Sequence, residues 1–144
     1  MPKSKRQEIY LLDTHMWLWL MNGDKQLKSS EVLKKLNQAA DSSYIYVSVI
    51  SVWEIGMLEA KKRIILPVNC YQWINQALKA PGISLMNLTP EIALDSTRLP
   101  NDFHGDPADR MIVATAKSLG ATLVTQDRHI IQYLKKENIP ALSI

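Results

Sequence analysis

Short apolar runs alternate along the chain with longer segments of mixed polarity. Residues 9–12 form a continuously apolar run that ends at Asp13, a pattern typical of a strand buried on both faces of a sheet. Further runs rich in apolar, β-branched and aromatic residues occur at residues 44–49, 83–86, 121–125 and 141–144. The pattern therefore predicts five strands.

Helical signals fill the segments between these runs. Residues 28–40 gather their apolar side chains on one side of a helix. Pro107 and Gly120 occupy the positions that favour the start and the end of a helix. Helices are predicted at residues 15–21, at 28–40, from Ser48 or Ser51 to about Lys61, at 68–79, from Pro90 onward, at 107–119 and at 128–136.

Strands that alternate with helices in this way predict βαβ units. The expected fold class is α/β, a three-layer α/β/α sandwich with a central, mainly parallel sheet. No repeat, linker or low-complexity segment interrupts the chain, so we expect one domain over residues 1–144. Residues 1–7 are expected to form a flexible basic N-terminus.

Composition limits the function classes without choosing among them. The chain has 144 residues, of which 47% are hydrophobic, and a net charge of +3, which permits a polyanionic partner but does not identify one. A single cysteine, Cys70, excludes an internal disulfide and favours a reducing compartment. Apolar stretches such as residues 16–21 are shorter than the roughly 20 residues of a membrane span. We therefore expect a cytoplasmic protein with no membrane contact.

Acidic residues occur where open α/β sheets bind ligands, beyond the carboxyl ends of the strands. Asp13 directly follows the first predicted strand, and Asp127 follows the fourth after one residue. Glu54 lies in the early turns of the helix after the second strand, and Asp106 and Asp109 flank the start of the helix before the fourth strand. Converging carboxylates repel one another unless they take up protons or hold a cation. All-oxygen ligands suit Mg²⁺ or Mn²⁺ rather than zinc.

Each of these acids also has an ordinary structural explanation. Asp106-Pro107-Ala108-Asp109 is a good helix start, and Ser51-Val52-Trp53-Glu54 matches a capping box. Asp13 and Asp127 can equally be loop or capping residues. For one position alone, capping explains the residue as well as ligation does, but several acids at one edge favour a shared site.

Four segments, in order, resemble the four motifs of PIN-domain toxins of the VapC type. They span residues 11 to 127 at family-like spacing, which covers most of the chain. The segments are Leu11-Leu12-Asp13-Thr14-His15, Ser51-Val52-Trp53-Glu54-Ile55, His104-Gly105-Asp106-Pro107-Ala108-Asp109-Arg110 followed by Met111-Ile112-Val113-Ala114, and Leu123-Val124-Thr125-Gln126-Asp127.

The resemblance implies a set of catalytic, metal-binding acids. By position in the motifs these are Asp13, Glu54, Asp109 and Asp127. Asp109 matches better than Asp106 because the Arg-Met-Ile-Val-Ala segment of the third motif follows it directly. Supporting roles, outside the direct ligands, are expected for Thr14, Asp106 and Thr125, whose side chains can orient carboxylates or bound water or cap a helix.

The resemblance also implies an activity and partners. We expect a metal-dependent endoribonuclease that hydrolyses RNA phosphodiester bonds with one or two Mg²⁺ or Mn²⁺ ions. It would be the toxin of a toxin–antitoxin pair, neutralised by a cognate antitoxin, and would form a homodimer. Arg110 and Arg128 can hold the RNA backbone, although Arg110 can instead pair with a neighbouring carboxylate. Trp17, Trp19 and Trp53 can serve protein contacts or the core.

Other classes fit the sequence less well. A haloacid-dehalogenase-like phosphatase needs a second Asp where this chain has His15, and a receiver domain needs a lysine after a late strand. Glycine-rich phosphate loops and a nucleophile elbow are absent, and one Cys with three dispersed His residues disfavours zinc. The alternative left open is a catalytically weak RNA-binding or protein-interaction PIN-like module.

Overall fold

The computed structural model describes residues 8–28, 30–42, 44–101 and 103–144. The expected flexible N-terminus, residues 1–7, lies outside the described residues. Five strands form one sheet in the order β3-β2-β1-β4-β5, and every neighbouring pair is parallel. The strands are β1 (Tyr10–Leu12), β2 (Ile45–Ser48), β3 (Ile83–Met86), β4 (Thr122–Val124) and β5 (Ala141–Leu142).

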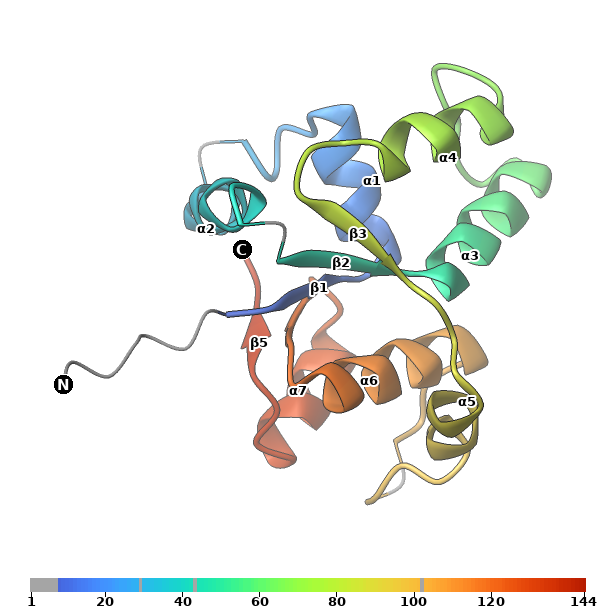
Figure 1. Ribbon diagram of the computed structural model, residues 1–144. Coiled ribbons are helices and arrows are strands. Elements are labelled where there is room, and N and C mark those ends of the chain that lie inside the picture. The colour runs from blue at the N-terminus through green and yellow to red at the C-terminus, as the bar shows by residue number, and fades with distance from the viewer. Residues whose placement is uncertain (1–7, 29, 43, 102) are drawn as a thin grey trace, which may run out of the picture.

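Helices cover both faces of this sheet, as Figure 1 shows. One face carries α1 (Thr14–Asn22), α2 (Glu31–Ala40), α3 (Val49–Ala60) and α4 (Cys70–Leu78). The other carries α5 (Pro90–Ser96), α6 (Pro107–Leu119) and α7 (Arg128–Lys136). The predicted three-layer α/β/α sandwich with a parallel sheet is confirmed.

The central strand β1 divides the interior into two hydrophobic cores. Successive side chains of a strand point to opposite faces. Leu12 accordingly packs into the core beneath α1 and α2, whereas Leu11 packs into the core against α6 and α7, and neither side chain is exposed to solvent. Burial on both faces explains why this strand is a continuous apolar run in the sequence.

Strand register brings three strand ends to the same edge. Leu12 is aligned with Val47 of β2 on one side and with Val124 of β4 on the other. Residues that follow β1, β2 and β4 are therefore neighbours in space although they lie far apart along the chain. This edge carries the candidate site.

Several element boundaries differ from the sequence prediction. Ser30 caps α2, so that helix begins at Glu31 rather than at residue 28. Ser48 caps α3, and Ser51 is a buried residue inside the helix, so the capping box expected from Ser51 to Glu54 does not form. The last strand is only Ala141–Leu142, shorter than residues 141–144. Within the described residues, no helix has the length and apolar character needed to cross a membrane.

Candidate active site

Asp13 follows β1 and is held by main-chain groups on two sides. Its N–H donates to the carbonyl oxygen of Val124 at 3.0 Å, which extends the β1–β4 ladder by one bond. Its Oδ1 accepts a hydrogen bond from the N–H of Met16 at 2.8 Å and so caps α1. The position of this carboxylate is thus set by the sheet and by the first turn of the following helix.

Asp127 has the same relation to β4 and α7. Its Oδ1 accepts hydrogen bonds from the N–H groups of His129 and Ile130, at 2.9 and 3.1 Å, and caps α7. Its own N–H donates to Thr125 Oγ1 at 3.1 Å. Thr125 is buried and also hydrogen-bonds Asp13, so one threonine supports the acids that follow both strands.

Glu54 reaches the same edge from α3 and is held by hydroxyl groups. The Thr14 hydroxyl donates to Glu54 Oε1 and lies 2.9 Å from Ser51 Oγ in a second hydrogen bond. A hydroxyl has one proton and an ionised carboxylate can only accept, so the Ser51 hydroxyl supplies the proton of the second bond. Thr14 and Ser51 are buried, and together they hold Glu54 toward the pocket.

Asp106 and Asp109 come from the start of α6 and differ in environment. Asp106 is exposed, and its Oδ1 accepts from the N–H of Asp109 at 2.8 Å, which caps the helix as its sequence suggests. Asp109 is half-buried. Burial raises the pKa of Asp109, and the negative charges of Asp106, Asp127, Glu54 and Asp13 raise it further, to about 7. Five carboxyl groups from four parts of the chain therefore share one region.

Burial also raises the pKa of Asp13, the most enclosed of these acids. The hydrogen bonds from Thr125 and Met16 and the nearby His15 oppose this effect, and the charge of Glu54 adds to it. Raised pKa values in a cluster of carboxylates mark a place where negative charge lacks a partner.

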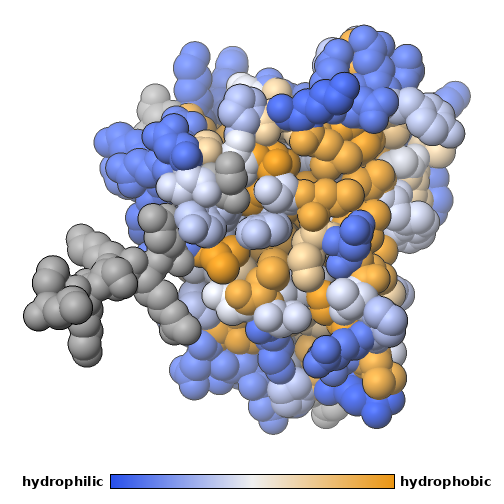
Figure 2. Space-filling view, viewed as in Figure 1, coloured by the Kyte–Doolittle hydropathy of each residue, from blue (hydrophilic) through white to orange (hydrophobic). Residues whose placement is uncertain are grey.

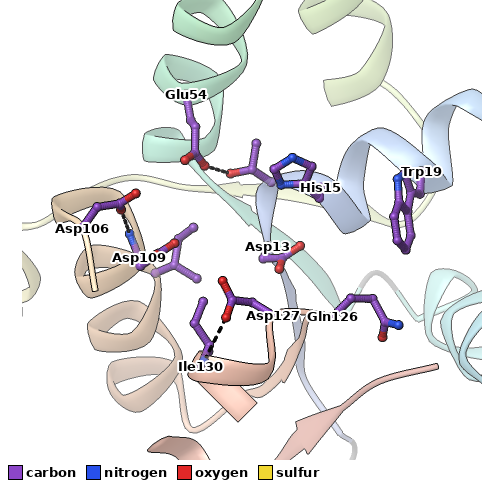
Figure 3. Close-up of a pocket in the computed structure, with 11 residues that line it drawn as sticks. Asp13, His15, Trp19, Glu54, Asp106, Asp109, Gln126, Asp127 and Ile130 are labelled. Atoms are coloured by element: carbon purple, nitrogen blue, oxygen red, sulfur yellow. Dashed lines mark hydrogen bonds between the residues drawn. The ribbon is translucent and has the colours of Figure 1, made fainter. Parts of the chain in front are cut away.

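The acids line a pocket of about 330 Å³ (Figure 3). All four predicted ligands, together with Thr14 and Asp106, lie on its wall. The wall also includes residues that were not predicted as part of the site, namely His15, Trp19, Ile112, Gln126 and Ile130. His15 and Trp19 are four residues apart on α1, and this spacing, which puts them on the same face of the helix, is the signal that could have located them together.

The loop before α6 is tied to the helices behind it. Arg110 donates through Nε to the carbonyl oxygen of Ser96 at 2.8 Å and through Nη1 to that of Phe103. His129 Nε2 lies 3.0 Å from the carbonyl oxygen of His104. A Cβ on Gly105 would overlap the Phe103 ring, so the backbone can pass this point only without a side chain. These contacts place the start of α6, and with it Asp106 and Asp109.

The expected pairing of Arg110 with a neighbouring carboxylate is wrong, because Arg110 hydrogen-bonds two carbonyl oxygens instead. Arg128 is exposed at the start of α7, and its contact with the RNA backbone stays a prediction. The three tryptophans differ in their exposure to solvent. Trp17 is fully buried and Trp53 is 56% exposed, whereas Trp19 has an intermediate exposure and lines the pocket.

A parallel α/β/α sandwich with an acidic pocket at the carboxyl ends of its strands matches a known class. The family model of the PIN domain matches residues 10–136, and the chain belongs to the PIN domain family. The chain is 34% identical over 122 residues to Ribonuclease VapC22 of Mycobacterium tuberculosis, a match that covers 83% of this chain and 88% of that protein.

Solved structures show the same fold. DNA-bound VapBC from Salmonella typhimurium contains a chain with a TM-score of 0.69 and 14% identity, covering 95% of this chain and 98% of that one. VapBC2 from Rickettsia felis, bound to a promoter DNA fragment, gives 0.67 and 17%, with 94% and 98% covered. At these identities the likeness concerns the fold.

Proposed function

We propose that the chain is a metal-dependent endoribonuclease that hydrolyses RNA phosphodiester bonds and acts as the toxin of a toxin–antitoxin pair. The observation that carries the proposal is the convergence of Asp13, Glu54, Asp109 and Asp127 on one pocket. The identity with a protein named as a VapC ribonuclease supports RNA as the substrate. A cytoplasmic location, supported by the single cysteine, fits this role.

The donor atoms of the pocket fit Mg²⁺ or Mn²⁺. Its charged ligands are carboxylates, the groups that hard divalent cations prefer. Asp13 and Asp127 each use Oδ1 as a helix cap, which leaves Oδ2 of each available to an ion. Within the described residues, no three His, Cys, Asp or Glu side chains are close enough together to hold a metal ion as they stand. Burial and then the repulsion among the carboxylates raise the pKa of Asp109, and a divalent cation would relieve that repulsion.

The residues of the chain would divide the work as follows. Asp13 and Asp127, held by the backbone, would position the cation, and Asp109 would join them in its ionised form. Thr14 would keep one oxygen of Glu54 occupied and direct the other toward the pocket. A bound cation would lower the pKa of a water molecule and offset charge on the leaving oxygen of the RNA phosphodiester. No histidine base is required.

Protein partners are part of the proposal. Exposed apolar side chains gather over β3, α3 and α4, as Figure 2 shows, and Tyr71 there is 88% exposed. Beside it lies a hollow of about 590 Å³ between α3 and α4, lined in part by Val52, Gly56 and Ile74. An apolar surface of this kind fits an antitoxin or a second copy of the chain. Sedimentation of the purified chain, alone and with an antitoxin added, measures both associations.

RNA cleavage tests the proposed activity. The purified chain is assayed on varied RNAs in Mg²⁺ or Mn²⁺ and in EDTA, with Asp13→Asn beside the wild type. Asn caps a helix as well as Asp, so the variant should fold while losing the charge. Asp95→Asn, an exposed position on α5, is the matched control. Cleavage that requires both metal and Asp13 supports the proposal.

The third motif provides a second comparison. We expect Asp109→Asn to abolish cleavage and Asp106→Asn only to weaken it, because Asp106 is exposed and caps α6 with one oxygen. Equal and complete losses would place Asp106 among the direct ligands. A folded, metal-loaded wild type that binds RNA and leaves it uncut would instead support the RNA-binding module.

A further inference from the structure

Trp19 stands between two hollows in the surface. It lines the acidic pocket and also a second hollow of about 290 Å³, whose wall includes Gly23, Leu27, Lys28 and Leu33. Trp19 belongs to both walls, so the two hollows adjoin at its side chain. An extended ligand that leaves the acidic pocket on this side has to pass the indole ring.

A rigid helix presents this ring. α1 is capped at its start by Asp13 and ends at Gly23, whose N–H donates to the carbonyl oxygen of Trp19 in a left-handed C-cap. The side chain packs partly against the core of that face and remains partly exposed. Figure 3 shows it across the pocket from Asp106, with Asp13 and Asp127 between them.

A cationic side chain lies beyond the ring. The pocket is lined by carboxylates, whereas the second hollow carries the exposed Lys28 together with Asp24, whose Oδ1 accepts a hydrogen bond from the N–H of Gln26. A nucleic acid strand presents an anionic phosphate, a flat base and the next phosphate in succession. Aromatic side chains flanked by cationic groups recognise unpaired nucleotides because any base can stack on the ring.

We infer that Trp19 is a stacking platform for an unpaired RNA base next to the cleaved phosphodiester, with Lys28 holding the phosphate beyond it. This inference rests on the proposed ribonuclease function and adds a subsite to it. The base needs its π-face free, so the subsite selects single-stranded RNA. A cation held by the carboxylates of the pocket would bind the reacting phosphate, and Trp19 would hold the neighbouring nucleotide.

The test starts from a randomised pool of single-stranded RNA, from which the most strongly cleaved sequence is synthesised with an abasic nucleotide at each position in turn. Loss of one stacked base should weaken binding about 10- to 100-fold. The same loss is expected when Trp19→Leu meets the intact RNA, with Trp19→Phe retaining most of the affinity. Binding is measured in the Asp13→Asn background and cleavage in the wild-type background.

Trp53→Leu is the matched control, because Trp53 lies on α3 away from the pocket wall and is 56% exposed. Non-additivity is the decisive readout: Trp19→Leu should bind intact RNA and RNA with the critical abasic position equally well. Lys28→Gln should reduce the slope of log affinity against log salt by about 1. Circular dichroism verifies that each variant is folded.

The outcomes separate the inference from the proposed function. A wild type that cleaves no RNA overturns both. A wild type that cleaves while Trp19→Leu matches it in binding and rate overturns the inference alone, and the ring then serves packing or a protein contact. Abasic substitutions that weaken binding of wild type and of Trp19→Leu by the same factor also overturn the inference. Because the abasic change is made in the RNA, this comparison does not depend on the stability of a protein variant.

Discussion

Replacing Asp109 with Asn should stabilise the chain in the absence of metal. Burial and four neighbouring carboxylates raise the pKa of Asp109 from 3.8 to about 7. A carboxyl group whose pKa is raised by folding contributes its full stability only below the pKa that it has in the unfolded chain. This contribution is lost as the pH rises from that pKa to the pKa of the folded state, about 7. Each pH unit corresponds to 1.36 kcal/mol, so the full difference is about 4 kcal/mol.

The half-exposed position of Asp109 reduces this figure. Solvent screens the repulsion, and we expect about 1–2 kcal/mol to remain. For a domain of this size that corresponds to a rise in melting temperature of about 3–8 °C. Asn carries no charge at any pH, so the gain over wild type should be small near pH 4 and complete above pH 7.

Thermal unfolding followed by circular dichroism in EDTA measures the effect at pH 4, 6 and 8. Asp95→Asn, exposed on α5 and outside the pocket, controls for the loss of one negative charge anywhere. Excess Mn²⁺ should reverse the order, because metal at 100 times its Kd stabilises a competent site by about 2.7 kcal/mol. A shift that is independent of pH, or equal in Asp95→Asn, would refute the account of crowded carboxylates.

Three further changes probe the supports of the site. Gly105→Ala should lower the melting temperature by about 3–9 °C, because its Cβ would overlap the Phe103 ring; an unchanged melting curve would mean that the loop shifts freely. Arg110→Lys should cost about 2–3 kcal/mol in urea unfolding through loss of the paired bonds to carbonyl oxygens. Thr14→Val should weaken metal binding about 10- to 100-fold by calorimetry, because Glu54 loses its donor, whereas Thr14→Ser should retain it.

Chain connectivity made Asp13 and Asp127 the most predictable residues of the site. Each follows a buried strand of a parallel sheet, and parallel strands share the edge at which they end. The register of β1 with β4 places these ends together, and the backbone bond from Asp13 to Val124 continues that register. Local sequence and one topological rule were sufficient here.

The environment of Glu54 was less accessible because it depends on contacts distant in sequence. The capping signal at Ser51 competes with the one at Ser48, and the strand that ends at Ser48 decides between them. Ser51 is then turned inward, where its hydroxyl meets Thr14 from another helix, 37 residues away in sequence. The spacing of three residues could have placed Ser51 and Glu54 side by side on the helix surface. It could not have identified Thr14 as the hydrogen-bond partner that they share.

The partners of Arg110 were the least predictable feature. In sequence it lies next to Asp109, and a cation beside an acidic cluster suggests an ion pair or a phosphate contact. Its guanidinium instead binds the carbonyl oxygen of Ser96, the last residue of α5, and that of Phe103 in the loop before α6. No periodicity or motif reports the path of such a loop, so only the three-dimensional arrangement identifies this role.

Capping and ligation, treated as competing explanations in the sequence, apply to the same residues. Asp13, Asp106 and Asp127 each cap a helix, so the N-termini of α1, α6 and α7 all face the acidic pocket. The positive ends of three helix dipoles offset part of the repulsion among the carboxylates, and each cap leaves one oxygen free for an ion. A motif search cannot separate the two roles because the fold uses one carboxylate for both. Substitution can: Asn keeps the cap and removes the charge, whereas Ala removes both and adds a stability cost of about 1 kcal/mol.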